Sequence, residues 1–368
     1  MPATAASARA RAALYNSLRT GLTRRGSLEV ETPIAVPFAG QEPHLRPFET
    51  RFTPDLPVPE GGIEGARRLH LQTSPEYAMK RLLSRDGFGR CHQIARVFRD
   101  GEVSRTHNPE FTLLEFYASP GSADSVMRDL EELLAEAAVA LNGTTRAPGQ
   151  KRLDLRAPFE RLTCQEAFER FAGFDPLPLD AEALAQAART VGIRPAEGAS
   201  WDDLFAQILL DKVEPCLGIE RPTYLTHYPA SQAALARLDP KDARVAERFE
   251  LYAGGLELAN GFSELTDEAE QRKRLREEQE LRQSLGREVF PLDEQFLAAL
   301  PRIGEAGGVA VGLDRVLMLL TGARDIAEVL LFPAIEEYAR ARAVDANAER
   351  VIDAHAARPI DDRGAARR

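Results

Sequence analysis

Residues 96–117 read RVFRDGEVSRTHNPEFTLLEFY, a polar loop between two segments that alternate as β-strands do. In the second segment, a period of two puts Phe111, Leu113, Glu115 and Tyr117 on one face and mainly apolar residues on the other. Elsewhere, helical periods such as those of residues 125–141 and 181–193 alternate with strand-like runs in no regular βαβ rhythm. The sequence therefore predicts an α+β fold, with helices flanking a largely antiparallel sheet.

The composition is that of an ordinary soluble globular protein, with 44% hydrophobic and 28% charged residues among 368. The 57 acidic and 47 basic residues give a formal charge of -10, so no general positive field draws the chain to a polyanion. Cys91, Cys164 and Cys216 have no CxxC spacing, which argues against a disulfide framework and a zinc cluster. No apolar run approaches the roughly 20 residues that span a bilayer. These features predict a cytoplasmic protein.

The first 28 residues contain no acidic residue and have the composition of a transit peptide. However, Leu14, Leu18 and Leu22 recur every fourth position and Gly26 ends the pattern, which favours an amphipathic helix that leads into a strand. Residues 52–68 are rich in Pro and Gly and predict a surface loop between strands.

The loop within residues 96–117 is rich in groups that bind anions. Arg99 ends the first strand, and Arg105, His107 and Asn108 follow it. A guanidinium fork is well suited to a phosphate group. The alternative is a cross-strand ion pair between Arg99 and Glu115, since such pairs are common and contribute little energy.

A second polar cluster lies in residues 249–265, FELYAGGLELANGFSEL, where the Gly-Gly pair at 254–255 predicts a two-residue hairpin turn. With that turn, Glu250 lies opposite Ala259 and Tyr252 opposite Glu257. The carboxylates of Glu250 and Glu257 then become diagonal neighbours on one face, which is unfavourable unless a cation lies between them.

Two carboxylates beside a phosphate site suggest Mg²⁺, and the alternative is a solvated hairpin face. Strict alternation puts Asn260, Phe262 and Glu264 on the opposite face of the hairpin. A single site that uses all of these residues therefore requires a β-bulge, for which Gly261 is the candidate position.

Residues 305–322, EAGGVAVGLDRVLMLLTG, predict a short strand that passes through Gly312 into a helix. Arg315 then lies in the first turn, where a cation opposes the helix dipole unless an anion is bound nearby. The alternative is that Asp314 supplies this negative charge locally.

Residues 71–83, LQTSPEYAMKRLL, predict a helix that starts at Ser74 with Pro75 at its first position. Glu76 in the first turn is favourable for capping alone. Together with Glu115 and Glu264, it also provides three carboxylates near the candidate ligand faces, as a substrate with two amino groups would need.

These stretches together resemble the catalytic core of class II aminoacyl-tRNA synthetases, specifically the lysyl enzymes. Residues 28–33, LEVETP, resemble motif 1, residues 98–117 motif 2 and residues 308–319 motif 3, and NGFSEL at 260–265 matches the lysyl group. The motifs occur in the family's order over about residues 10 to 333. This resemblance implies a class II synthetase-like catalytic domain at 1–333, followed by an Ala/Arg-rich extension at 334–368 that we expect to be partly disordered.

Lysyl-tRNA synthetases carry an OB-fold anticodon-binding domain before motif 1, and we expect none here because motif 1 begins close to Met1. The chain therefore looks like the stand-alone paralogues that modify elongation factor P, the elongation factor P (R)-β-lysine ligase family. Ser74, Ala310 and the order Gly101-Glu102 support this assignment, since lysyl enzymes more often have Ala, Gly and Glu-Gly at these positions.

The resemblance implies roles for individual residues. It implies catalytic roles for Arg99 and Arg315 and a Mg²⁺ site at Glu250 and Glu257. The implied ATP-binding residues are Arg99, Asp100, Gly101, Glu102, His107, Asn108, Phe111, Glu257, Leu258, Gly312 and Arg315. The implied substrate-binding residues are Ser74, Glu76, Glu115, Tyr117, Asn260, Phe262, Glu264 and Ala310.

The implied reaction is the ATP-dependent activation of (R)-β-lysine or lysine, followed by transfer to a lysine of elongation factor P. The implied assembly is a homodimer that binds neither tRNA nor a membrane. Two alternatives stay open at this point. One is tRNA charging without an anticodon domain, and the other is a non-catalytic regulatory paralogue.

Overall fold

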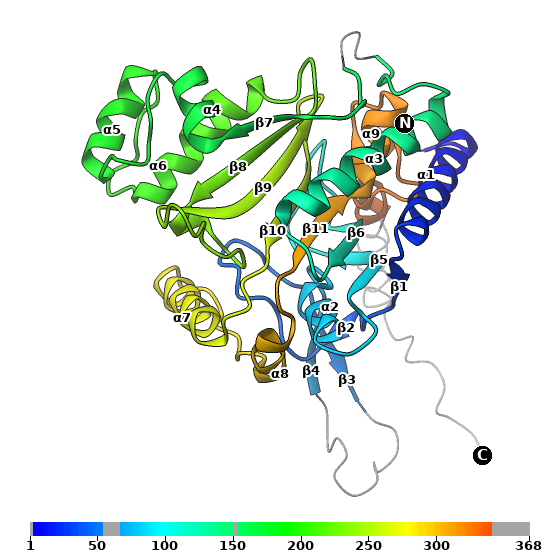
Figure 1. The fold of residues 1–368 in the computed structure, drawn as a ribbon, viewed down its shortest axis with the longest axis horizontal. Helices are drawn as coiled ribbons and strands as arrows, with labels where there is room; N and C mark the ends of the chain where they lie inside the picture. The colour runs from blue at the N-terminus through cyan, green and yellow to red at the C-terminus, as the bar shows by residue number, and fades with distance from the viewer. Residues whose placement is uncertain (1–2, 54–66, 150–152, 341–368) are drawn as a thin grey trace, which may run out of the picture.

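The computed structural model describes residues 3–53, 67–149 and 153–340. An eight-stranded sheet in the order β1-β5-β6-β11-β10-β9-β8-β7 runs through this part of the chain (Figure 1). Its strands are β1 (Leu28–Glu29), β5 (Arg90–Phe98), β6 (Glu110–Ala118), β7 (Glu160–Thr163), β8 (Thr223–Pro229), β9 (Val245–Ala253), β10 (Leu256–Ser263) and β11 (Gly307–Gly312). A three-stranded sheet in the order β2-β4-β3 contains β2 (Ala35–Val36), β3 (Glu49–Phe52) and β4 (Arg67–Leu71).

The large sheet is antiparallel from β5 through β8, and its two edge strands are parallel to their neighbours, β1 to β5 and β7 to β8. The predicted α+β fold with a largely antiparallel sheet is therefore confirmed. The strand expected at residues 28–33 is short, because only Leu28–Glu29 pairs with the sheet.

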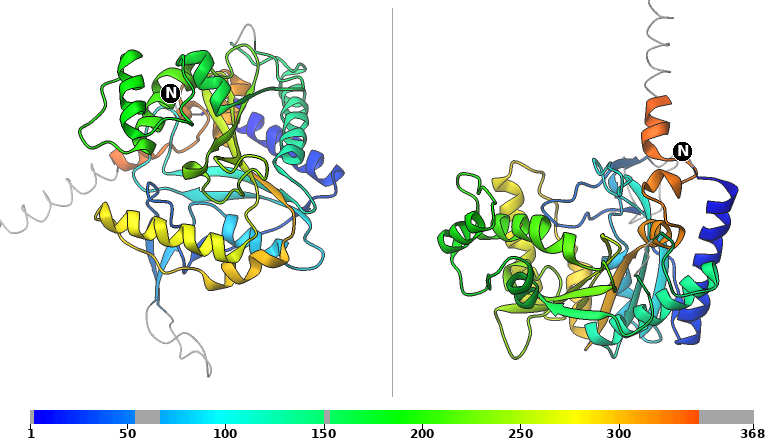
Figure 2. Two further views of the ribbon diagram at one scale, coloured as in Figure 1. Left: turned by 60° about the vertical axis from the view of Figure 1, so that its left-hand side comes forward. Right: turned by 90° about the horizontal axis from the view of Figure 1, so that it is seen from above.

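The described helices lie around this sheet (Figure 2). They are α1 (Ala5–Arg24), α2 (Glu76–Leu83), α3 (Ala123–Asn142), α4 (Cys164–Phe171), α5 (Ala181–Thr190), α6 (Trp201–Ile208), α7 (Glu268–Ser284), α8 (Glu294–Ala299) and α9 (Leu313–Thr321). Helices α4, α5 and α6 form a separate group beyond β7 and β8 with a hydrophobic core of its own (Figure 1). None of the described helices is long and apolar enough to cross a membrane.

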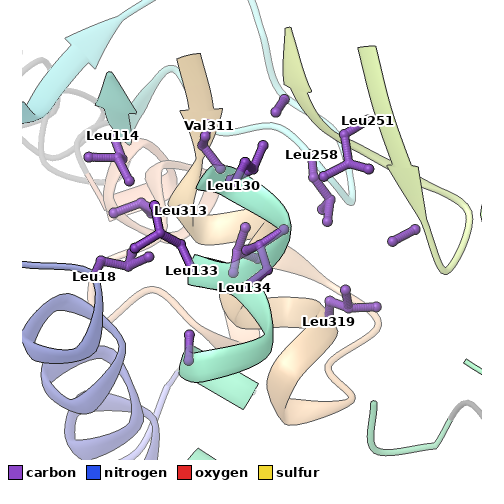
Figure 3. Packing of buried hydrophobic residues seen from close by; sticks show 14 of the residues in the cluster. Leu18, Leu114, Leu130, Leu133, Leu134, Leu251, Leu258, Val311, Leu313 and Leu319 are labelled. Carbon is purple, nitrogen blue, oxygen red and sulfur yellow. The ribbon is translucent and has the colours of Figure 1, made fainter. Parts of the chain in front are cut away.

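The main hydrophobic core lies between one face of the sheet and helices α1, α3 and α9 (Figure 3). Leu18 of α1, Leu130 of α3 and Leu313 of α9 meet Leu114 of β6 in this layer. The predicted N-terminal helix is thus confirmed, because Leu14, Leu18 and Leu22 are all buried. Helix α3 begins with a capping box at Ser122 and ends at Gly143 with a left-handed φ of 68°.

Alternation along the strands leaves the other face of the sheet for polar residues. Leu114 and Phe116 belong to the main core, so Glu115 and Tyr117 face the opposite side, as the sequence predicts. In the register of the sheet, Glu115 lies beside Ala310, Ala310 beside Asn260, and Asn260 beside Glu250. One row of candidate site residues therefore crosses four strands.

The hairpin of β9 and β10 differs in part from the prediction. The turn is confirmed, with φ of 62° and 77° at residues 254–255, and Tyr252 pairs with Glu257. The expected pairing of Glu250 with Ala259 is wrong, because the register shifts between Glu257 and Ala259 and brings Asn260 opposite Glu250. The bulge lies there, at Leu258 rather than at Gly261.

Gly261 is required for a different reason. A β-carbon at this position would lie 2.4 Å from Cζ of Phe249 and 2.6 Å from the carbonyl oxygen of Gly308. The bulge at Leu258 turns Asn260 and Phe262 toward the face of Glu250, which places them with the other candidate site residues.

Two predicted segments fall largely outside the described residues. The predicted surface loop is described only at its ends, since residues 54–66 are not described. Of the predicted C-terminal extension, residues 334–340 are helical, and residues 341–368 lie outside the described residues.

Candidate active site

A pocket of about 160 Å³ opens on the polar face of the sheet, between the loop of residues 99–109 and the N-terminus of α9. Most of the predicted nucleotide-binding residues line it. They are Arg99, Glu102, His107, Asn108, Phe111, Glu257, Leu258, Gly312 and Arg315. Asn260 and Ala310, predicted to bind the substrate, also line the pocket. The structure thus brings most of the predicted nucleotide-binding residues and two of the predicted substrate-binding residues to one pocket.

Arg99 is placed to bind an anion. Its guanidinium carbon lies 5.1 Å from the centroid of the Phe111 ring, and its Nε is buried without a hydrogen-bond partner among the described residues. Its ion pair is a long one, 3.9 Å from Nη1 to Oε1 of Glu102, rather than the cross-strand pair with Glu115 that was the alternative. A buried and unsatisfied guanidinium N–H indicates a missing acceptor.

Arg315, a second cation at the pocket, is hydrogen-bonded to His107. Nη1 of Arg315 donates to the carbonyl oxygen of Glu257 at 2.8 Å, and its Nη2 lies 2.6 Å from Nε2 of His107. Because an arginine can only donate, Nε2 of His107 must be the unprotonated acceptor. Burial, together with the positive charges of Arg315 and Arg99, lowers the pKa of His107 to about 4.

Asp314 does not supply the charge that faces Arg315. Its carboxylate lies 2.5 Å from Nη2 of Arg11 in α1, and it accepts a hydrogen bond from the amide of Thr112 at 2.8 Å. The alternative that Asp314 supplies the negative charge beside Arg315 is therefore wrong. Asp314 instead connects α9 to α1 and β6.

Two predicted ATP-binding residues, Asp100 and Asn108, have other partners in the structure. Asp100 pairs with Arg46 at 2.6 Å, and neither Asp100 nor Gly101 lines the pocket. The side-chain amide of Asn108 donates to the carbonyl oxygen of Glu110, and its oxygen accepts from the amide of Ala334. Asn108 thus holds the segment that follows α9 against β6.

Glu250 and Glu257, the predicted metal ligands, lie in unlike surroundings. The two oxygens of Glu250 accept hydrogen bonds from four donors, the hydroxyls of Tyr228 and Tyr252 and the side chains of Arg248 and Asn260. The side chain of Glu257 is 40% exposed, and its Oε2 lies 3.3 Å from Arg315. Glu257 therefore offers an accessible carboxylate at the pocket, whereas Glu250 is already saturated.

The described residues contain no group of three or more His, Cys, Asp or Glu side chains arranged to hold a metal ion. A cation at this place would need ligands from a bound molecule in addition to the protein carboxylates.

Next to this pocket, Glu115 is a buried carboxylate with two hydroxyl partners. Ser74 donates to its Oε1 at 2.6 Å and Tyr117 to its Oε2 at 3.0 Å. Burial, followed by the nearby charge of Glu76, raises the pKa of Glu115 to about 8, although these hydrogen bonds and Lys80 oppose the shift. Without a bound cation, Glu115 is therefore mostly protonated at neutral pH.

Ser74 also accepts a hydrogen bond from the amide of Glu76 at 3.0 Å. Helix α2 has its first position at Glu76, one residue later than predicted, with Pro75 as its cap residue. The position of Ser74 outside the helix leaves its hydroxyl free to donate to Glu115 while its oxygen caps the first turn.

Glu76 and Glu264 both form an ion pair with Lys80, a residue that was not predicted to belong to the site. The ammonium of Lys80 lies 2.6 Å from Oε1 of Glu76 and 2.5 Å from Oε2 of Glu264. The side chain of Lys80 is 0% exposed. The spacing of four between Glu76 and Lys80 within α2 was a signal for one of these pairs, but the pairing with β10 needed the fold.

The polar partners of Glu250 were also missed. Tyr252 could have been found, because it alternates with Glu250 on one strand. Arg248 could have been found for the same reason, because it precedes Glu250 by two residues on β9. Tyr228 on β8 approaches Glu250 only through the pairing of the sheet. Glu214, which follows α6 in the chain, extends the same network, with its Oε1 3.2 Å from the hydroxyl oxygen of Tyr252.

Comparisons with known proteins agree with this geometry. The family described as tRNA synthetases class II (D, K and N) matches residues 2–336. The chain is 41% identical over 326 residues to the elongation factor P--(R)-beta-lysine ligase of Proteus mirabilis (strain HI4320), an alignment that covers 88% of this chain and 93% of that protein. It is 42% identical over 325 residues to the protein of the same name from Klebsiella pneumoniae (strain 342), with the same two coverages. The protein of that name from Histophilus somni (strain 2336) is 40% identical over 324 residues, again with 88% and 93% covered.

Proposed function

Since the chain belongs to the class II (D, K and N) tRNA synthetase family, and within it groups with elongation factor P--(R)-beta-lysine ligases, we propose that it attaches (R)-β-lysine, or lysine, to elongation factor P. The reaction consumes ATP and passes through an aminoacyl-adenylate. One observation carries this proposal: a guanidinium that no described residue satisfies lies beside an aromatic ring, on the same sheet face as a cluster of three carboxylates, of which Glu115 and Glu264 are buried and Glu76 is partly buried. That arrangement suits a molecule with an acidic end and two ammonium groups.

In the first half-reaction, a carboxylate oxygen of the amino acid attacks the α-phosphorus of ATP. The new bond joins this oxygen to phosphorus, the bond to the bridging oxygen of the β-phosphate breaks, and pyrophosphate leaves. Arg99 orients the two anions and neutralises charge that develops at the α-phosphate. Arg315 and neutral His107 face the outer phosphates, and the Phe111 ring supports the adenine. No nucleophile from the protein is needed.

Of the two predicted Mg²⁺ ligands, Glu257 could bind the ion directly, whereas Glu250 could bind it only by giving up a hydrogen-bond donor. The exposed carboxylate of Glu257 would hold the ion together with phosphate oxygens, and Glu250 would become a ligand on giving up one of its four donors. When bound, the ion supplies further charge neutralisation at the phosphates.

In the second half-reaction, the neutral ε-amine of a lysine on elongation factor P attacks the acyl carbon of the adenylate. An amide bond forms, the bond from acyl carbon to the phosphate oxygen breaks, AMP leaves, and the amine releases its proton to water. We propose that this reaction takes place in the cytoplasm, where elongation factor P and ATP meet.

The first half-reaction is tested by ATP–pyrophosphate exchange with purified full-length protein. We expect exchange that depends on (R)-β-lysine or lysine, and at least about a hundredfold less exchange with norleucine, which lacks the ε-amine and would leave buried carboxylates unpaired. Equal exchange with norleucine, or no exchange with either lysine isomer, would contradict the proposal.

Gly308 provides a prediction about the shape of the amino-acid site. A β-carbon at this position would lie 2.3 Å from both Oε1 of Glu264 and Cε1 of Tyr117. The Gly308→Ala variant must move one of them, so we expect the KM for (R)-β-lysine to rise about tenfold or more in the exchange assay. The KM for ATP serves as the internal control and should change less than about threefold. An unchanged KM for the amino acid would show that the site tolerates the shift.

We further propose that two chains form a homodimer. A groove of about 580 Å³ runs along α1, β5 and residues 330–338. Large apolar side chains are exposed near it, namely Leu331, Phe332, Ile335 and Tyr338, with Phe332 75% exposed. Such a surface supports an interface between copies. We expect a mass in solution twice that of the 40.5 kDa chain, and a shift to monomer in Phe332→Asp. A wild-type monomer at micromolar concentration would contradict this.

A further inference from the structure

Lys80 lies at the centre of the carboxylate cluster. It follows Glu76 by one turn of α2, and its ammonium joins that residue to Glu264, which lies just after β10. The ammonium also lies 5.9 Å from the centroid of the Phe262 ring. A helix and a strand from distant parts of the sequence are therefore held at a fixed separation by one buried cation.

Packing alone does not require a charged side chain at the position of Lys80. The helix buries Lys80 together with Met79 and Leu83, which belong to an apolar cluster with Tyr117 and Phe296. A buried ammonium is unfavourable unless it is paired, and an apolar side chain of similar volume often serves stability equally well. The charge of Lys80 therefore calls for a role besides filling space.

The net charge of the cluster of Glu76, Lys80, Glu115 and Glu264 indicates which kind of ligand the cluster could bind. Glu76, Glu115 and Glu264 carry three negative charges when all are ionised, and Lys80 carries one positive charge, which leaves two negative charges uncompensated. A diamino acid brings two ammonium groups. Oε1 of Glu264 is buried without a hydrogen-bond partner, and the carboxyl of Glu115 has only hydroxyl groups as its hydrogen-bond donors among the described residues.

We propose that Lys80 is a positioning residue for the diamino-acid substrate: it holds Glu76 and Glu264 in place and leaves the cluster two negative charges, one for each substrate ammonium. Lys80 does not touch the reacting atoms and acts through the two carboxylates. This inference rests on the proposed function, because it presumes a substrate with two amino groups.

The loss of Lys80 has a specific physical consequence. Without the ammonium, the carboxylates of this site repel one another more strongly, and at least one further carboxylate takes up a proton or turns away. A protonated or displaced carboxylate no longer pairs with a substrate ammonium. The ATP pocket, which none of Glu76, Glu264 and Lys80 lines, is not affected by this change.

The test is Lys80→Met in the full-length protein, assayed by ATP–pyrophosphate exchange. We expect the KM for (R)-β-lysine to rise at least about a hundredfold, with the KM for ATP changed less than about threefold. A merely structural role would reduce the amount of active protein and leave both KM values unchanged. The matched control is Lys273→Met, which removes a 66% exposed lysine on α7 and should change neither KM.

A second comparison keeps the inference testable if Lys80→Met folds poorly. Lys80→Met combined with Glu264→Gln removes the ammonium together with one of its partners, which relieves the buried repulsion. Two factors are compared: the rise in the KM for (R)-β-lysine that Lys80→Met causes in the wild type, and the rise that it causes when added to Glu264→Gln. We expect the second factor to be at least tenfold smaller than the first, or the KM to stay nearly unchanged in the Glu264→Gln background. A rise of a hundredfold in both backgrounds would overturn the role through Glu264.

The outcomes also separate this inference from the proposed function. Exchange by the wild type with an unchanged amino-acid KM in Lys80→Met would overturn the role of Lys80 alone. No exchange by the wild type with any diamino acid would overturn both.

Discussion

Arg99→Ala is expected to lower the rate of adenylate formation by about a thousandfold or more. In the part of the chain that the structure describes, Nε of Arg99 is buried without a hydrogen-bond partner and the guanidinium lies over Phe111, so this group is available to bind the reacting anions. Its loss removes both orientation and charge neutralisation at the α-phosphate. The measurement is kcat/KM in ATP–pyrophosphate exchange.

The matched control for this prediction is Arg96→Ala on β5, the strand that Arg99 directly follows. Arg96 is exposed and pairs with Glu110 at 2.5 Å, an interaction that contributes little energy. We expect its activity to stay within about threefold of the wild type. Loss of activity in Arg96→Ala as large as that in Arg99→Ala would mean that the strand, rather than the phosphate contact, is responsible.

Glu115→Gln is expected to raise the KM for (R)-β-lysine about a hundredfold or more, because a buried substrate ammonium loses its carboxylate partner. Glutamine keeps the shape of the side chain and can still accept a hydrogen bond from Ser74. Glu110→Gln, on the same strand but exposed and paired with Arg96, is the control and should leave this KM unchanged.

The pH dependence of binding gives an independent check on Glu115. Its pKa of about 8 means that the carboxyl is protonated below that pH, whereas pairing with an ammonium requires the ionised form. The affinity for the amino acid should therefore rise by up to about tenfold per pH unit between pH 6 and 8 and then level off. This dependence should be weaker in Glu115→Gln, and an identical pH profile in the two proteins would contradict the assignment.

The stability of the ligand-free protein should change with pH in the direction opposite to that of its affinity for the amino acid. A carboxyl whose pKa is raised by folding stabilises the protein fully only below its unfolded pKa, and this contribution is lost as the pH rises toward 8. The ligand-free Glu115→Gln variant should therefore melt at a temperature no lower than the wild type at pH 8. A large KM effect in a variant that is equally stable points to the site rather than to the fold.

The local patterns in the sequence predicted the elements that frame the site. Alternation identified β6, the leucine period identified α1, and the run from Gly312 into α9 was predicted as a strand followed by a helix. These features depend on neighbours in the chain, so periodicity detects them. The turn at residues 254–255 was predicted for the same reason.

What the sequence could not predict depends on contacts between distant residues. The bulge at Leu258 has no glycine or proline to mark it, and Gly261 attracted the prediction although it serves the packing of Phe249. The sequence alone indicates that Lys80 is a cation on an amphipathic helix, and such a side chain is normally exposed. Only the approach of β10 to α2 shows that its partner is Glu264.

The central claim, transfer of a lysyl group to elongation factor P, is tested most directly by the intact mass of that protein. It would be incubated with the full-length chain, ATP, Mg²⁺ and either lysine isomer, with bulk tRNA as a parallel acceptor. The account predicts one added lysyl unit on elongation factor P and none on tRNA. An unchanged mass of elongation factor P beside charged tRNA would contradict the account and assign the chain to tRNA charging, and no product on either acceptor would favour a non-catalytic paralogue.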